Sequence, residues 1–256
     1  MQDLTISLIQ TTVDWEDKSQ NLTRFQKLIS RTPNSDLIVL PEMFNTGFSM
    51  DAEKHAETMA GITVSWLKEM ASTSKSAVAG SLIIEENGKF YNRFVMAHPS
   101  GTIERYDKRH AFSMAGEDKV FSKGLSVALW KINGWTICPM VCYDLRFPVW
   151  SRNTNHYDLL LYTANWPEKR IGHWSALLKA RAIENQCYVA AVSRIGEDGQ
   201  AINYNGQSTI IDFDGSALNQ TTSSETVITA TLSKKYLQDR RNQFPVLEDG
   251  DTFHVE

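Results

Sequence analysis

The chain has 256 residues, of which 42% are hydrophobic and 22% charged, so it is not mainly disordered, and 14 Gly with 7 Pro exclude a collagen-like repeat. The 26 Lys and Arg residues are interspersed with 30 Asp and Glu residues, and the formal net charge of -4 leaves no basic stripe for nucleic acid or an acidic membrane surface. No signal peptide or bilayer-spanning run is visible, and three cysteines are too few for a disulfide framework. We therefore expect a cytoplasmic protein that binds neither nucleic acid nor membranes.

The first 107 residues predict strands that alternate with helices and then form a meander. Apolar and polar residues alternate over 4–10, which predicts a strand, and apolar residues at helical spacing predict a helix over 17–32. The apolar run at 37–40 is typical of a short buried strand. A second helix over 65–74 is followed by predicted strands over 77–85, 90–98 and 102–107.

The remainder begins with a segment, 108–126, of weak periodicity, which we interpret as a long loop of the kind that is often functional. Asn133-Gly134 is a strong hairpin signal between predicted strands at 127–132 and 135–141. Further elements are expected as a helix from about residue 148, a strand at 159–162, a helix at 173–185, strands near 187–193, 207–212 and 226–232, and a helix at 233–241.

These elements predict the layering of the fold. The chain has no internal repeat, low-complexity tract or linker, so we expect one domain over residues 1–256. Strand–helix alternation and hairpins occur together, which predicts mixed sheets. There are too many strands for one small sheet, and two sheets packed face to face with helices outside would bury all the apolar faces. The sequence thus predicts an α/β protein with two sheets and outer helices.

Polar side chains with complementary chemistry follow three of the predicted strands. Glu42 comes directly after the strand at 37–40, Lys108 after the strand at 102–107, and Cys142 after the strand at 135–141. A rigid sheet fixes groups at the ends of its strands. A thiol, a carboxylate and an ammonium are sufficient for acyl transfer, because the thiol attacks a carbonyl, the carboxylate moves its proton and the ammonium stabilises the oxyanion.

Each of these residues also has a plainer interpretation. A buried structural role is the commonest fate of an intracellular cysteine, Lys108 lies in a run of charges, and Glu117 alone resembles a loop charge. The apolar strand that runs into Cys142 and a polar tripeptide resembles a nucleophile elbow. Cys138 would lie about 13 Å from Cys142 in an extended strand, too far for a disulfide, and no second ligand pair completes a zinc site. Nothing marks His110 as the base of a Cys-His hydrolase, so a carboxylate base is preferred.

Taken together, three stretches resemble the nitrilase superfamily of carbon–nitrogen hydrolases. They are Leu-Pro-Glu at Glu42, Tyr-Asp-Lys-Arg-His around Lys108, and Val-Cys-Tyr-Asp-Leu-Arg-Phe-Pro around Cys142. The resemblance covers nearly the whole chain. It implies a four-layer α-β-β-α sandwich, in agreement with the two-sheet prediction, and a homodimer that extends the sandwich. No motif implies a metal, nucleotide or organic cofactor.

The resemblance also implies roles for individual residues. Cys142 would be the nucleophile, Glu42 the general base and Lys108 the oxyanion partner, whose positive charge should also favour the thiolate. Glu117 resembles the second glutamate that orients the substrate and the lysine in many members. The backbone N–H of Tyr143 would be the second oxyanion donor.

Within the superfamily the chain is most similar to bacterial omega-amidases. The similarity lies in the segment from Cys142 to residue 148, in Thr-Ala-Asn-Trp-Pro at 163–167, and in Lys-Ala-Arg-Ala-Ile-Glu-Asn at 179–185. Such enzymes hydrolyse the terminal amide of 2-oxoglutaramate and 2-oxosuccinamate to the oxo diacid and ammonia. A nitrile hydrolase, an N-carbamoyl amide hydrolase and a non-catalytic module that binds small molecules remain alternatives.

The far carboxylate of an omega-amide requires a cation or several N–H donors in the pocket. Arg170 and Lys169 are the first candidates and Arg146 is a third, although we favour for Arg146 a structural role, in which it holds the elbow through a buried ion pair with Asp144. Side chains that are also candidates for the pocket wall are Asn165, Trp166, Tyr143 and Phe112.

Overall fold

The structure, a computed structural model, describes residues 2–255 as two β-sheets packed face to face. The six-stranded sheet has the order β13-β1-β2-β3-β4-β5, with parallel pairs among β1, β2 and β3 and antiparallel pairs elsewhere. The predicted mixed sheet is therefore confirmed. Its strands are β1 (Leu4–Gln10), β2 (Leu37–Val39), β3 (Ala77–Glu86), β4 (Lys89–Ala97), β5 (Ile103–Asp107) and β13 (Thr226–Leu232).

The five-stranded sheet has the order β12-β9-β8-β7-β6, and its three central strands are parallel. A separate two-stranded hairpin, β10 (Ile195–Glu197) with β11 (Asn203–Asn205), follows β9. The strands of the five-stranded sheet are β6 (Trp130–Ile132), β7 (Trp135–Val141), β8 (Leu159–Ala164), β9 (Tyr188–Ser193) and β12 (Thr209–Ile211).

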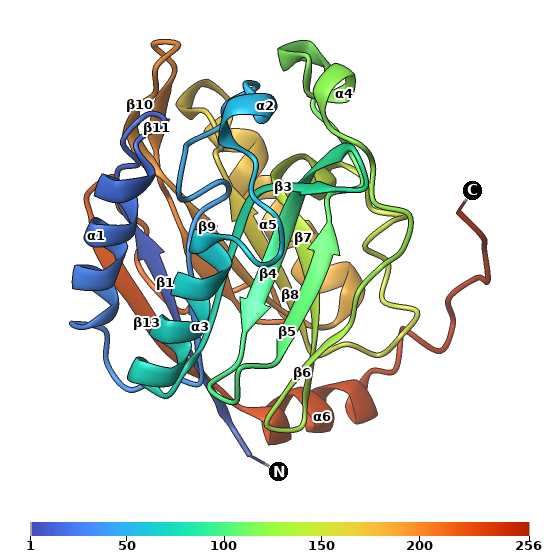
Figure 1. Cartoon of the computed structure of the whole chain (residues 1–256). Coiled ribbons are helices and arrows are strands. Elements are labelled where there is room, and N and C mark those ends of the chain that lie inside the picture. Colours follow the sequence, from blue (N-terminus) through green and yellow to red (C-terminus); the bar gives the residue numbers. More distant parts are fainter. Residues whose placement is uncertain (1, 256) are drawn as a thin grey trace.

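Helices cover the outer faces of both sheets (Figure 1). The helices α1 (Lys18–Ile29) and α3 (Ile62–Ser74) pack on the six-stranded sheet, and α5 (Ile171–Asn185) packs on the other, which confirms the four-layer α-β-β-α order. None of the helices in residues 2–255 has both the length and the apolar character that crossing a membrane requires. The remaining helices are α2 (Ala52–His55), α4 (Glu117–Val120) and α6 (Lys234–Gln243).

The strand residues alternate between two apolar layers. Ile6 and Leu8 of β1 face the large core between the sheets, whereas Ile9 faces the layer under α1 and α3. In β2, Val39 belongs to the first layer and Ile38 to the second. Side chains of a strand point alternately to its two faces, so continuous apolar runs are what a sheet covered on both faces requires.

The structure differs from the predicted elements mainly where elements are short. The helix expected from about residue 148 is wrong, because the chain instead forms a 3₁₀ turn over Cys142–Arg146 and bends through residues 148–151. The expected loop at 108–126 contains a 3₁₀ turn, Ser113–Ala115, and the helix α4. Helix α2 and the hairpin β10–β11 were not predicted, since elements of three or four residues carry too little periodicity.

The topology brings the carboxyl ends of several strands to one edge of the sandwich. In the six-stranded sheet β2 runs parallel to β3, and β5 runs in the same direction because two antiparallel pairings separate it from β3. In the other sheet β7 and β8 are parallel. Hydrogen bonds across the two sheets, such as that from Thr163 Oγ1 to the Leu40 carbonyl at 2.8 Å, place all four strand ends together.

Candidate functional site

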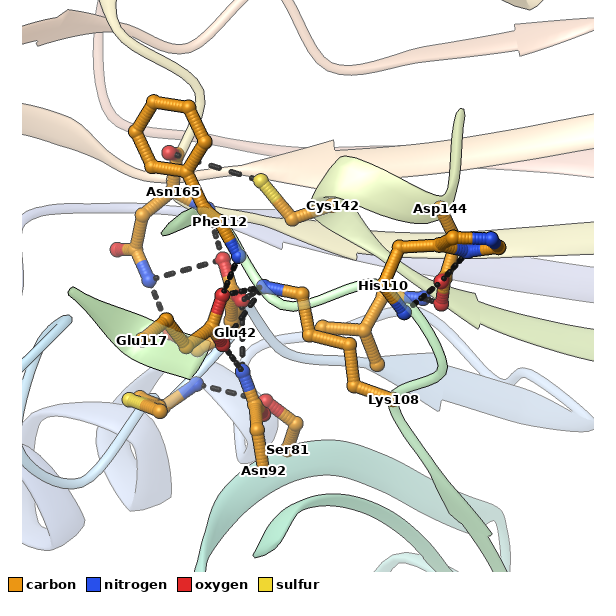
Figure 2. A network of polar contacts seen from close by, with 12 residues as sticks. Glu42, Ser81, Asn92, Lys108, His110, Phe112, Glu117, Cys142, Asp144 and Asn165 are labelled. Carbon is orange, nitrogen blue, oxygen red and sulfur yellow. Dashed lines mark hydrogen bonds and ion pairs between the residues drawn. The ribbon is translucent and has the colours of Figure 1, made fainter. Parts of the chain in front are cut away.

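Glu42, which follows β2, is completely buried and is held from both sheets. Its Oε1 accepts a hydrogen bond from Asn92 Nδ2 at 2.8 Å and contacts Lys108 Nζ at 2.9 Å. Its Oε2 accepts the backbone N–H of Asn165 at 2.9 Å (Figure 2). Both oxygens are therefore fixed before any ligand binds.

Lys108, at the end of β5, is buried between two carboxylates. Its Nζ lies 2.9 Å from Glu42 Oε1 and 2.9 Å from each oxygen of Glu117. Burial by itself lowers the pKa of Lys108, but the charges of Glu117 and Glu42 outweigh it and raise the pKa above its usual range. The ammonium thus remains charged despite its burial.

Glu117 begins α4 and is also completely buried. Besides Lys108, it accepts hydrogen bonds from the Phe112 backbone N–H at 2.5 Å and from Asn92 Nδ2 at 3.2 Å. Burial raises the pKa of the Glu117 carboxyl, against the opposing charge of Lys108. Asn92 of β4 was not predicted as a site residue, and it bridges Glu42 and Glu117.

Cys142 opens the 3₁₀ turn with a φ of 42°, a left-handed conformation that a non-glycine residue rarely adopts. Its Sγ lies 3.8 Å from the Asn165 carbonyl oxygen (Figure 2). The Tyr143 N–H is among the first donors of this turn, which lack acceptors within the turn. The elbow predicted from the sequence thus has the strained backbone of that motif.

Burial and nearby charges of both signs act in opposite directions on the pKa of the Cys142 thiol. Burial raises the pKa of the thiol well above its usual range, and the nearby charge of Glu42 raises it further. Lys108 acts in the opposite direction but does not prevail. The charge of Lys108 thus favours the thiolate, as expected, but burial and the charge of Glu42 outweigh it and raise the pKa of the thiol.

The predicted ion pair between Arg146 and Asp144 is wrong. The carboxylate of Asp144 accepts from Tyr106 Oη at 2.8 Å, from the His110 backbone N–H at 2.9 Å and from the Val141 N–H at 3.0 Å, and it pairs with His110 Nδ1 at 2.8 Å. The guanidinium of Arg146 instead donates to His173 Nδ1 at 3.2 and 3.3 Å. Residues two apart in a helical turn do not face each other, and Asp144 therefore binds β5 whereas Arg146 reaches the pocket.

A pocket opens over these groups. The predicted pocket residues Phe112, Tyr143, Asn165, Trp166 and Arg170 all line it, together with Arg146. Lys169 is exposed and lies outside the wall, which excludes it as the cation expected there. Wall residues that sequence reasoning missed are Phe48, Ala115 and Pro167, with Gln200, Ile202 and Tyr204 from the hairpin β10–β11 and its turn.

In residues 2–255 no group of three or more His, Cys, Asp or Glu side chains is arranged to hold a metal ion. Cys138, Cys142 and Cys187 are all free thiols. The polar groups at the pocket base therefore act on one another and on whatever enters the pocket.

Comparisons with known proteins agree over the whole chain. The family described as carbon-nitrogen hydrolase matches residues 5–242. The omega-amidase YafV of Escherichia coli K12 is 42% identical, with 100% of both chains covered. A 2-oxoglutaramate amidase of Bacillus subtilis is 32% identical, with 96% of each chain covered. A solved structure, XC1258 of Xanthomonas campestris, described as a CN-hydrolase superfamily protein with an arsenic adduct in its active site, has a TM-score of 0.97 and 40% identity over 100% of both chains.

Proposed function

The chain belongs to the carbon–nitrogen hydrolase family, and from that premise we propose that it is an omega-amidase. Its substrates are the terminal amides of 2-oxo dicarboxylic acids, such as 2-oxoglutaramate and 2-oxosuccinamate, and its products are the oxo diacid and ammonia. The relatives named omega-amidase and 2-oxoglutaramate amidase support this substrate class. The observation that carries the proposal is that buried Glu42 and Lys108 lie with half-buried Cys142 at the base of one pocket.

The first chemical step is attack of the Cys142 sulfur on the amide carbon. Because the pKa of the thiol is raised, the proton leaves during the attack and not before it, and Glu42 accepts it. Lys108 Nζ and the Tyr143 N–H donate to the oxygen that becomes negative. Preorganised donors of this kind are worth about 3 to 4 kcal/mol each in the barrier.

The second step breaks the C–N bond. Glu42 returns its proton to the nitrogen, ammonia leaves, and the acyl group remains on sulfur as a thioester. Glu42 then takes a proton from water, whose oxygen attacks the thioester. The C–S bond breaks, Glu42 gives the proton to the leaving sulfur, and the Cys142 thiol and the ionised base are regenerated as the acid product leaves. Division into two steps helps because a thioester is a much better acceptor for water than an amide.

Glu117 and Asn92 act through other residues in this mechanism. Glu117 holds Lys108 Nζ with both oxygens, and Asn92 donates to both Glu42 and Glu117. We assign them as positioning residues, because their hydrogen bonds point to the catalytic groups. Asn165, with its N–H on Glu42, has the same role from the opposite sheet.

We also propose that the chain acts as a cytoplasmic single-domain homodimer in which the two sandwiches are joined. The family resemblance supports this, as do exposed apolar side chains on the outer helices, Ile183 on α5 and Tyr236 on α6. Sedimentation equilibrium tests the assembly, and a monomer at micromolar concentration would refute it.

A substrate panel tests the function. Ammonia release is measured with 2-oxoglutaramate, with a simple nitrile and with an N-carbamoyl amino acid, and we expect turnover of 2-oxoglutaramate. Consumption of the nitrile or the carbamoyl compound alone would refute an omega-amidase. Intact-mass spectrometry during turnover should show an acyl adduct on Cys142, and Cys142→Ala should remove both the adduct and the ammonia. Absence of adduct and ammonia in the unsubstituted chain would favour a non-catalytic binding module.

A further inference from the structure

The pocket contains two cations that the catalytic cluster does not use. Of the four charged residues on its wall, Glu42 and Lys108 are paired with each other, and Lys108 is also paired with Glu117. The other two charged residues are Arg146 and Arg170, both half-buried. Within residues 2–255 neither guanidinium is paired with a carboxylate, since Arg146 donates to a histidine and Arg170 lies over an aromatic ring.

Aromatic side chains fix the positions of these two arginines. The Arg170 guanidinium lies 5.3 Å from the centroid of Phe112, and Phe112 is 5.0 Å from the ring of Tyr143. The Arg146 guanidinium lies 5.9 Å from Tyr143 and 4.8 Å from Trp166. Trp166 Nε1 in turn donates to the Arg170 carbonyl at 2.9 Å. The five residues thus form a closed series of contacts on the pocket wall.

This arrangement prepares both guanidiniums for an anion. A ring that stacks on the face of a guanidinium leaves the N–H edge available for hydrogen bonds. The planar fork of N–H groups matches a carboxylate and gives strong charge-assisted bonds. Arg146 has used only part of its donor set on His173, and no side-chain hydrogen bond of Arg170 is present in the described residues.

We propose that Arg146 and Arg170 together bind the carboxylate at the end of the substrate opposite to the amide, so that the enzyme selects short amides that carry an anion and disfavours neutral amides and nitriles. This inference rests on the proposed function, because it assigns the far end of the same pocket. At the reacting end of the pocket, the negative charge of Glu42 repels the carboxylate that forms from the amide. The substrate is therefore oriented by charge, with the amide at Cys142 and the anion at the arginines.

A binding experiment tests the arginine site without relying on turnover. Alkylation of Cys142 by iodoacetamide is followed by intact mass in the presence of glutarate, or of the neutral analogue 1,5-pentanediol. Glutarate should slow the alkylation and pentanediol should not. Arg146→Gln and Arg170→Gln should each raise the protective glutarate concentration at least about tenfold, because a hydrogen bond to a charged group is worth roughly that factor.

Matched variants complete the test. Lys169→Gln removes the same charge one residue away from Arg170 but outside the pocket, and it should behave as the unsubstituted chain. Arg170→Lys, which keeps the charge and loses the fork, should recover part of the protection. Thermal unfolding of each variant confirms that the fold is intact. The inference would be overturned if glutarate protected both arginine-to-glutamine variants as well as it protects the unsubstituted chain. It would also be overturned if glutarate protected none of the proteins.

Turnover separates this inference from the proposed function. The ratio of kcat/KM for glutaramate to that for pentanamide, a neutral amide of equal chain length, should be large and should fall in the Arg146→Gln and Arg170→Gln variants. Equal kcat/KM values for the two amides would leave an amidase but refute the arginine site. Arginine-dependent protection by glutarate without ammonia release from any amide would support the arginine site and refute the amidase.

Discussion

Asn165 holds Glu42 through two well-formed hydrogen bonds, from its backbone N–H to Glu42 Oε2 at 2.9 Å and from its side-chain amide to the Glu42 carbonyl at 2.8 Å. The two residues follow β2 and β8, which belong to different sheets. The packing of one sheet on the other therefore determines where the proposed base lies. A site built in this way moves only if the sandwich itself deforms.

We expect Asn165→Ala to lower kcat for 2-oxoglutaramate by about 10²-fold, because small displacements of a catalytic group have effects of that size. KM should change little if Asn165 positions Glu42, whereas a large rise in KM with constant kcat would show that Asn165 binds the substrate directly. Steady-state kinetics distinguish the two outcomes. Asn155→Ala, at an exposed asparagine, is the matched control and should retain full activity.

Glu42→Gln should have opposite effects on turnover and on thiol reactivity. Loss of the base should reduce kcat by about 10² to 10⁴-fold. Burial and the charge of Glu42 both raise the pKa of the Cys142 thiol, so removal of that charge lowers the pKa and increases the thiolate fraction at pH 8. Iodoacetamide should then alkylate Cys142 faster than in the unsubstituted chain. Slower alkylation of the variant would show that Glu42 generates the thiolate in the resting protein.

Lys108→Met should reduce both activity and stability. The lost oxyanion donor should lower kcat by about 10² to 10³-fold. Glu42 and Glu117 would then be buried side by side without a cation, at a cost of about 3 to 5 kcal/mol in the free energy of unfolding. Guanidinium chloride titrations measure this cost.

The double variant Lys108→Met, Glu117→Gln tests the electrostatic origin of that instability. It removes one of the two buried negative charges together with the cation, so it should unfold at a higher denaturant concentration than Lys108→Met alone, while kcat stays low. If the two variants are equally unstable, the loss arises from packing and not from charge.

The sequence allowed the ends of the longer strands to be predicted but not the contacts between distant segments. The strands β1, β7 and β13 have the predicted bounds, because each carries an alternating or continuous apolar pattern of seven residues. The predicted end of β7 at residue 141 therefore placed Cys142 correctly at a strand end. Asn92, in contrast, gains its role only when β4 lies beside β3 and the chain folds Glu42 and Glu117 onto it.

The elbow shows a different limit of sequence reasoning. Pro148 is a common start signal for a helix, and it led to the helix that the structure lacks. The helical turn begins earlier in the chain, at Cys142, and the Asp144 carboxylate accepts the Val141 N–H there at 3.0 Å. The Asp144 carboxylate is also bound by Tyr106 and His110, which lie at the end of another strand. Contacts with such a distant segment cannot be read from the local sequence pattern.

Glu86, at the end of β3, supplies a pH dependence of stability that is separate from the site. Its carboxylate contacts Arg93 at 3.0 Å and Arg105 at 2.9 Å, and the hydrogen bond from Arg93, with the charges of both arginines, lowers the pKa of Glu86 to about 2. A pKa that is lower in the folded than in the unfolded state stabilises the fold above the usual carboxyl pKa, and this stability is lost between about pH 4.5 and pH 2. Because the side chain is 35% exposed, solvent screening limits the contribution to about 1 kcal/mol. Urea titrations should therefore show Glu86→Gln to be less stable than the unsubstituted chain at pH 7 by that amount, and the difference should shrink at pH 4 and again at pH 3. The control Glu69→Gln, at an exposed glutamate, should show no such trend. A difference that is constant from pH 7 to pH 3 would contradict the ion-pair origin.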